Sequence, residues 1–179
     1  MSCNALTDIE KGCENNQGGI KRFWVVPFAD VDVATEAVTG DGILTTITLS
    51  SISPAADFVE YYLPKNTASF VEDSVTSQAS EGIVHTVVTT LSLKRREVAK
   101  RNSLALLASG YQFLFIIMED ANGLFWAQGW KNGSDLTSIG EGSGVAKADG
   151  SKYSVVITSE EAQMMPEVAS ALMSSLGLI

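Results

Sequence analysis

Very few residues in this chain of 179 have side chains that could carry catalysis. His85 is the single histidine, so a Ser-His-Asp or Cys-His relay would have to use it. Its segment alternates between apolar and polar residues, which predicts a strand with His85 on the apolar face. The run GEGSG from Gly140 to Gly144 superficially matches the nucleophile elbow G-x-S-x-G, but it lies between β-type segments. We therefore expect no catalytic residues and interpret His85 as a packed or interfacial side chain.

Metal and phosphate chemistry have equally little support in the sequence. Cys3 and Cys13, together with the single histidine, make at most three zinc ligands and have no useful spacing. Residues 30–32 and 120–123 carry oxygen ligands suitable for calcium, but neither run continues as an EF-hand, and turn formation explains the second. The glycine-rich run 140–144 lacks the Lys-Ser/Thr pair of a phosphate-binding loop. The sequence thus predicts no metal and no cofactor.

Charge is distributed unevenly along the chain. The net charge is −9, which disfavours a general nucleic-acid-binding protein, because such a protein needs a basic face. Five of the twelve basic residues nevertheless fall within eight positions, namely Lys94, Arg95, Arg96, Lys100 and Arg101. One interpretation is a solvated helix start, although cations are poorly placed at a helix N-terminus. The other is a subunit interface, in which this basic cluster contacts an acidic surface of a second copy.

The elements that must position these residues are mostly strands. Alternation and turn residues predict strands over 20–28, 43–50, 58–63, 67–75, 82–95 and 153–158. We expect 58–63 and 67–75 to pair with each other around Pro64-Lys65-Asn66. The strand 82–95 would span roughly 43 Å, more than twice a typical strand. It should therefore bend at a bulge or project beyond its own domain.

Two helices and one loop-rich region complete the expected elements. Residues 97–109 predict a helix in the middle of the chain. Ser159 is expected to cap the last helix, with Glu161 in its first turn, although Pro166 would move the start later. Residues 131–152 contain several glycines and are expected to be rich in loops.

Residues 111–130 form the most informative stretch, YQFLFIIMEDANGLFWAQGW. Two apolar runs around Asn122-Gly123 predict a β-hairpin. The first arm is apolar on both faces, so it must be covered on one side by the domain's core and on the other by something else. A helix or another copy of the chain would provide that cover, and this favours assembly.

These elements define the expected organisation. Residues 1–19 are polar and are interpreted as an N-terminal arm, and residues 20–179 as a single β-rich assembly domain. We expect neither a signal peptide nor a membrane span, and a soluble protein made in the cytosol. The predicted fold is mainly β, of the α+β kind: an antiparallel β-sandwich or partly open barrel with a flanking helix and a C-terminal helix.

Several stretches taken together resemble small structural proteins of tailed bacteriophages that infect Bacteroides-type hosts, including crAss-like phages. The resemblance is to proteins of the tail-tube or tail-ring kind. It covers most of the chain and rests on CENNQGGIKRFWVVPF, EDANGLFWAQGW, GSGVAKADGSKYSVVIT and the C-terminal helical end. The most specific parts are Cys13 to Pro27 and Asn122 to Trp130.

The resemblance implies a non-enzymatic virion protein, assembled in the cytoplasm of the host bacterium. Copies would form a ring of six or twelve beside neighbouring portal or tail proteins, with inner strands lining a channel for DNA. Such channels tend to be negative, because phosphate-neutralising contacts would hold a duplex that has to slide. The acidic balance of the chain agrees with this, and residues 82–95 are the candidate for a strand that reaches a stacked ring.

Two alternatives remain open. One is a head-to-tail connector or completion protein at the junction between portal and tail. The other is a host-binding or glycan-binding β-sandwich that decorates the virion, in which Trp24, Trp126 and Trp130 would stack on sugars. A small hydrolase is disfavoured by the single histidine.

Overall fold

The computed structural model describes residues 16–49, 58–77, 82–109, 113–146 and 149–179. These residues form one mixed, mostly antiparallel sheet of eleven strands with two short α-helices. The strands are β1 (Ile20–Pro27), β2 (Val31–Val38), β3 (Ile43–Leu49), β4 (Val59–Tyr62), β5 (Ala68–Ser77), β6 (Gly82–Lys94), β7 (Leu114–Asp120), β8 (Phe125–Gln128), β9 (Ser134–Gly142), β10 (Lys152–Glu161) and β11 (Glu167–Val168). The helices are α1 (Val98–Ser109) and α2 (Ser170–Ser175), and a 3-10 turn, η1, spans Phe28–Asp30.

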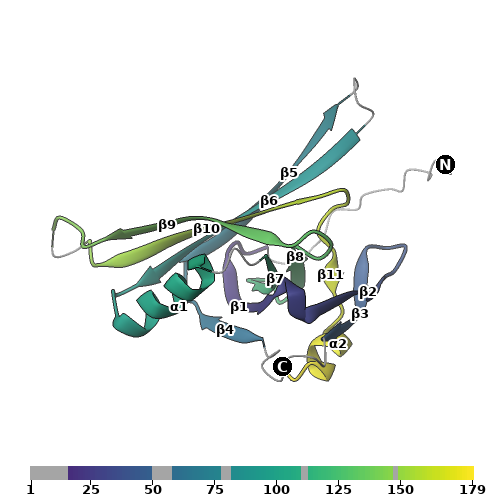
Figure 1. Cartoon of the computed structure of the whole chain (residues 1–179), viewed down its shortest axis with the longest axis horizontal. Coiled ribbons are helices and arrows are strands. Elements are labelled where there is room, and N and C mark those ends of the chain that lie inside the picture. Colours follow the sequence, from purple (N-terminus) through teal and green to yellow (C-terminus); the bar gives the residue numbers. More distant parts are fainter. Residues whose placement is uncertain (1–15, 50–57, 78–81, 110–112, 147–148) are drawn as a thin grey trace.

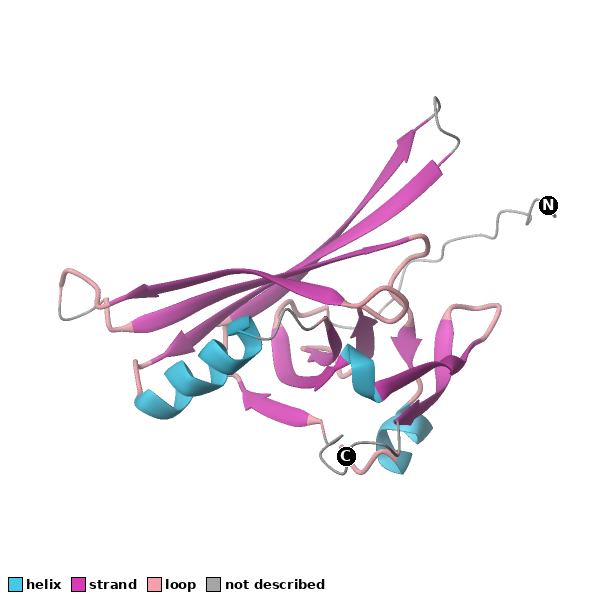
Figure 2. Cartoon of the chain, viewed as in Figure 1, coloured by secondary structure: helices cyan, strands magenta, loops and turns pink. Residues whose placement is uncertain are grey.

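The sheet has two parts that meet at a corner (Figures 1 and 2). Seven strands follow the order β4-β1-β7-β8-β11-β3-β2, and the other four follow β9-β10-β6-β5. The parts join where Leu114 of β7 pairs with Ser134 of β9. Figure 1 shows the four-stranded part lying across the rest of the molecule, with β5 and β6 continuing past it as a projecting hairpin. The sheet is open, because β2 and β5 stand at opposite ends of the strand order.

The first hydrophobic core lies between these two parts. Alternate residues of β6 and β10 point into it, which is the two-residue period of a strand with one face buried. Facing them are Phe23 and Val25 of β1 and the even-numbered residues of β7, and Leu104 of α1 packs at the margin. The buried members on β6 and β10 are Val87, Leu91, Leu93, Tyr153, Val155 and Ile157. The four-stranded part therefore has one face in the core and one face turned outward.

The second core covers the opposite face of β7. Phe115 and Ile117 pack there with Trp24, and α2 adds Leu172 and Met173. Every residue from Leu114 to Met118 is at most 1% exposed. The prediction that this arm is covered on both sides is thus confirmed. The second cover comes from β3 and α2 of the same chain, however, so this hairpin does not require another copy.

A buried polar group links the two parts of the sheet. The hydroxyl of Thr89 donates a 2.6 Å hydrogen bond to Oε1 of Gln128, and both residues are 0% exposed. Nε2 of Gln128 donates in turn to the carbonyls of Val87, at 3.3 Å, and Ile157, at 3.4 Å. Buried polar groups are costly unless satisfied, so these bonds fix how β8 sits against β6 and β10.

Most of the expected elements are confirmed within a residue or a few of their predicted ends. The mainly β class, the antiparallel pairing, the middle helix and the hairpin around Asn122-Gly123 are all present. The long strand is β6, of thirteen residues: ten of them pair with β10, and the end before His85 projects past it, which is one of the two expected outcomes.

Two expectations are wrong, and a third holds only in part. The strands β4 and β5 do not pair with each other, because β4 pairs with β1 and β5 pairs with β6. The region 131–152 is rich in loops only outside 134–142, because those residues form β9, which pairs with β10. Ser159 does not cap a helix, because β10 continues to Glu161 and the last helix begins at Ser170.

Candidate functional site

The basic cluster lies at the corner where β6 ends and α1 begins. Lys94 is the last residue of β6, and Lys100 and Arg101 lie in the first turns of α1. Arg95 turns the chain between them with a left-handed φ of 64°, which is uncommon for a residue with a Cβ. Its backbone N–H donates to the carbonyl of Ser151, which holds this corner against the chain that leads into β10.

Among the described residues, three of the five cations have carboxylate partners. Nε of Arg95 lies 3.1 Å from Oε1 of Glu97, and Nζ of Lys100 lies 3.4 Å from Oε2 of the same glutamate. Arg96 donates a 2.7 Å hydrogen bond to Glu141 of β9, and its guanidinium lies 5.9 Å from the ring centre of Tyr153. Hydrogen bonding to Tyr153, and then to Glu141, raises the pKa of Arg96 above its ordinary value.

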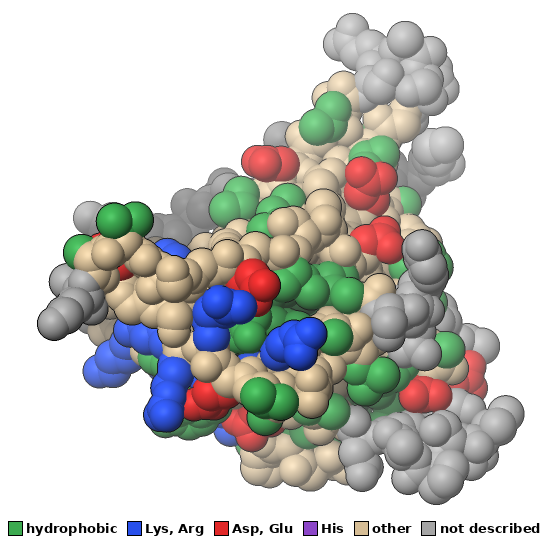
Figure 3. All heavy atoms as spheres, turned by 60° about the vertical axis from the view of Figure 1, so that its left-hand side comes forward, with side chains coloured by type: hydrophobic (Ala, Val, Ile, Leu, Met, Phe, Trp, Pro, Cys, Tyr) green, Lys and Arg blue, Asp and Glu red, His purple; other side chains and the backbone are tan. Residues whose placement is uncertain are grey.

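The structure therefore brings the five predicted cations into one region, but their surroundings differ. Arg96 is engaged with β9 and β10, whereas the Arg95 side chain is 82% exposed and Arg101 is also exposed. Figure 3 shows Lys and Arg side chains gathered on one half of this face, away from the projecting hairpin, which carries acidic and hydrophobic side chains. That the cluster forms a subunit interface stays a prediction, with Arg95 and Arg101 as its outward-facing members.

His85 has neighbours that the sequence analysis missed. It pairs with Ser74 across β5 and β6, and the Ser74 hydroxyl lies 2.7 Å from Nδ1 of the imidazole. Oε1 of Glu72 lies 3.9 Å from the same nitrogen and also accepts a hydrogen bond from the N–H of Met165. A Ser-His-acid relay needs the serine and the acid on different ring nitrogens. This arrangement places both on one nitrogen, so it is not the geometry of a relay.

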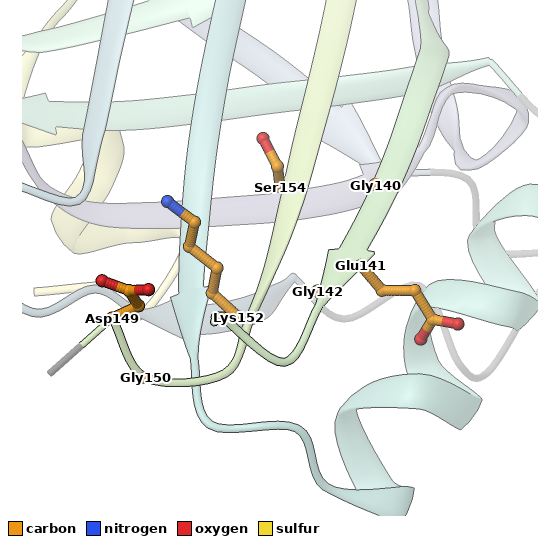
Figure 4. Close-up of a pocket in the computed structure, with 8 residues that line it drawn as sticks. Gly140, Glu141, Gly142, Asp149, Gly150, Lys152 and Ser154 are labelled. Atoms are coloured by element: carbon orange, nitrogen blue, oxygen red, sulfur yellow. The ribbon is translucent and has the colours of Figure 1, made fainter. Parts of the chain in front are cut away.

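The Gly140 to Gly144 run is not a nucleophile elbow in the structure. It covers the end of β9 and the turn that follows, and the Ser143 hydroxyl donates to the carbonyl of Gly144. A cavity of about 510 Å³ lies beside it, lined by Lys152 and Ser154 among others. Figure 4 shows the Glu141 side chain pointing away from Lys152 and toward α1. The lining residues include neither Ser143 nor a histidine.

In the oxygen-rich turn at 120–123, protein donors occupy the oxygens of Asp120. Oδ1 of Asp120 accepts hydrogen bonds from the N–H groups of Asn122 and Leu124, and Oδ2 accepts one from Nε1 of Trp126. In the part of the chain that the structure describes, no group of three or more His, Cys, Asp or Glu side chains is arranged to hold a metal. The cysteines Cys3 and Cys13 lie outside the described residues. Across the described ranges, no helix has the length and apolar character to cross a membrane.

The projecting hairpin is the most unusual surface of the molecule. The last β10 residue, Glu161, pairs with His85, so beyond that point β5 and β6 form a two-stranded ribbon. Isolated two-stranded hairpins are at best marginally stable in water. Large apolar side chains on this ribbon are nevertheless exposed, with Val75 at 63%, Ile83 at 52% and Val84 at 44%. The sequence predicted a bend or a projection, but not that both faces of a projecting ribbon would carry exposed apolar groups.

Comparisons with known proteins add no assignment. No family model matches the chain, and no curated protein matches it in sequence.

Proposed function

We propose that this chain is a non-enzymatic structural protein of a tailed-phage virion, which assembles with copies of itself into a ring or tube of the tail and forms part of the DNA channel. Six or twelve copies would close such a ring, beside portal or tail proteins. The fold would then be a tail-tube-like β-sandwich, whose two layers are the two parts of the sheet, with the helices at its flanks. Assembly would take place in the cytoplasm of the host bacterium.

The observation that carries the proposal is the outward face of the four-stranded part. Side chains on this face alternate with the buried ones, so rows of small residues run across all four strands. One row joins Ser138, Val156, Thr90 and Ser69 through paired positions on β9, β10, β6 and β5. The next row contains Asp135, Thr158, Val88 and Val71. A broad, small-residue face of this kind suits the wall of a channel.

The charges around that face also support a channel. Across the paired positions, the two rows contain no Lys or Arg and one acid, Asp135, and the nearest row on the side of the projecting hairpin carries Glu160 and Asp73. Only at the opposite end of the strands do Lys94 and Lys152 pair. Phosphate contacts from lysine and arginine give DNA most of its non-specific affinity for proteins. A wall without them, and acidic at one end, would let a duplex slide.

Unpaired strand edges give the chain a means of assembling. β5 stands at the end of the strand order. The edge of β9 opposite β10 pairs, among the described strands, only with β7, at Leu114. Exposed edges and two-stranded ribbons invite pairing with another chain. In a ring, β5 of one copy would lie beside β9 of the next, and the exposed valines and isoleucine of the projecting hairpin would be covered by a neighbouring copy.

The glycan-binding alternative has less support. Trp24 is 1% exposed and Trp130 is 3% exposed, so neither presents a ring face for stacking on a sugar. Trp126 is partly buried against Phe70. A connector ring would use the same face and edges as a tail ring, and it remains the closest alternative.

The test is the mass and shape of the purified protein. Light scattering coupled to gel filtration should give a multiple of the 19.0 kDa chain mass consistent with six or twelve copies. Negative-stain images should show rings or tubes with a central opening, and a low-salt gel-shift assay should show no retained duplex. A monomer at every concentration, or tight retention of DNA, would contradict the proposal.

A further inference from the structure

A second surface has the chemistry to receive the basic cluster. It is a groove of about 520 Å³ where β5, β8 and β11 come together near the turn before β3. Its apolar lining comes from Phe70, Trp126, Met164 and Met165, and three acids complete it: Asp41, Glu72 and Glu167. We call this the acidic groove.

Contacts within the chain hold the groove in shape. The rings of Phe70 and Trp126 pack with centroids 6.5 Å apart at 49°, and Nε1 of Trp126 donates to Asp120. The N–H of Glu167 donates to the carbonyl of Gly42, which fixes one wall against the turn before β3. Met164, at 61% exposed, leaves an apolar surface open at the mouth.

This combination of side chains selects a cation with a flat apolar face. Aromatic rings attract cations through their negative faces, and arginine is the side chain that most often exploits this. Carboxylates beside the rings add charge-assisted hydrogen bonds to a guanidinium. A phosphate or other anion would be repelled by the same three acids.

The chain itself supplies such a group at a different place. Arg95 and Arg101 are exposed at the corner after β6, whereas Phe70 and Glu72 pair with Thr89 and Val87 further along the same ladder. Because Lys94 and Val87 lie seven positions apart on one strand, the two surfaces are separated by about 20 Å. A copy therefore cannot place its own cluster in its own groove. Different surfaces that complement each other give a head-to-tail contact, which closes a ring when the rotation allows.

We propose that the acidic groove of one copy binds the Arg95 and Arg101 side chains of a second copy. This inference rests on the proposed function in that both require self-assembly. It adds the acceptor surface, the direction of the contact and the side chains that make it. Glu97 already neutralises part of Arg95, so entry into the groove exchanges or shares that partner.

Reciprocal charge reversal tests the contact. One variant carries Arg95→Glu and Arg101→Glu, and the other carries Asp41→Lys and Glu167→Lys. Each should raise the protein concentration needed for half-maximal assembly by about tenfold or more, because like charges then face each other. Mixed in equal amounts, the two variants should assemble again, since the acidic corner of one fits the basic groove of the other. Circular dichroism and thermal melting confirm that each variant is folded.

The matched control carries Glu60→Lys and Glu160→Lys, which change net charge equally at exposed sites outside the groove. It should assemble at the wild-type concentration. Two outcomes would overturn the groove contact and leave the proposed function standing. In one, the groove variants assemble like this control; in the other, the mixture fails to assemble although the wild type does. A wild-type chain that never assembles would overturn both.

Discussion

Two β-hairpins of this chain have similar apolar patterns and opposite surroundings. The β7–β8 hairpin is enclosed on both faces by the chain's own cores, and Phe115 and Ile117 are 0% exposed. The β5–β6 hairpin runs out past β10, and Val75 and Ile83 at its far end are more than half exposed. Apolar surface that the chain itself leaves uncovered therefore lies in the second hairpin. Strand pattern alone pointed to the first, because a sequence shows which faces are apolar but not which segments will cover them.

The largest expected effect lies in the enclosed hairpin. Phe115→Ala should lower the free energy of unfolding by about 3–5 kcal/mol, through lost burial and the cavity left behind. Phe113 is two residues away and 50% exposed, so Phe113→Ala is the matched control and should cost about 1 kcal/mol. Urea unfolding followed by circular dichroism compares the two. Equal losses would mean that the two rings do not differ in burial as described.

A smaller loss is expected where β6 meets the enclosed region. Thr89→Val removes the hydroxyl that donates to Gln128 and leaves a buried amide oxygen short of a partner. The expected cost is about 1–3 kcal/mol. Thr90→Val, one residue along on the outward face, should change the free energy of unfolding by about 0.5 kcal/mol or less. The same urea titration separates them, and a neutral Thr89→Val would remove the polar link between the two parts of the sheet.

For the projecting hairpin, the expected effect is on assembly rather than folding. Val75→Thr combined with Ile83→Thr keeps β-branched shapes but removes apolar contact, so the free energy of unfolding should stay within about 0.5 kcal/mol. Sedimentation velocity should show assembly weakened by about tenfold. Val59→Thr makes the same exchange at a site on β4 that is 55% exposed, and it should assemble normally. If the double variant assembles as strongly as the wild type, the hairpin is not an interface.

The smallest effect concerns pH. Burial raises the pKa of Glu161 above the ordinary value of 4.5, although the N–H groups of Lys131 and Asn132 donate to it and oppose the shift. The folded chain then holds this proton more tightly than the unfolded chain. Its contribution is fully present below pH 4.5 and is lost as pH rises through the raised pKa. Glu161→Gln should flatten that part of the stability curve, measured by thermal melting between pH 4 and pH 7, and an unchanged slope would contradict it.

The sequence was most informative where local signals and tertiary pairing agree. Turn residues around Asn122-Gly123 and the alternation along β6 both describe their strands correctly, because each signal acts within a few residues. The sequence did not predict which strands pair when they are far apart in the chain. The turn Pro64-Lys65-Asn66 suggested that β4 and β5 pair, but each strand found a partner elsewhere in the sheet.

Local sequence signals also predicted the wrong secondary structure where strand pairing within the sheet outweighed local propensity. Ser159, followed by two glutamates, has the composition of a helix start, yet ten pairs between β10 and β6 hold this segment as a strand. Glycines and polar residues after 131 indicated loops, but β9 is stabilised by pairing with β10 rather than by its own propensity. The basic cluster was readable as a run of residues. The acidic groove was not, because its lining comes from β5, β8, β11 and the turn before β3.

The most direct test of self-assembly through the projecting hairpin is to shorten it. Replacing residues 75–84 with an Asn-Gly turn joins Ser74 to His85, which are paired across the two strands, and removes most of the exposed apolar ribbon. Mass measurement and negative-stain imaging should then find rings or tubes for the wild-type chain and a folded monomer for the shortened chain, with an unchanged melting temperature. Rings that form equally well without the ribbon would contradict the account.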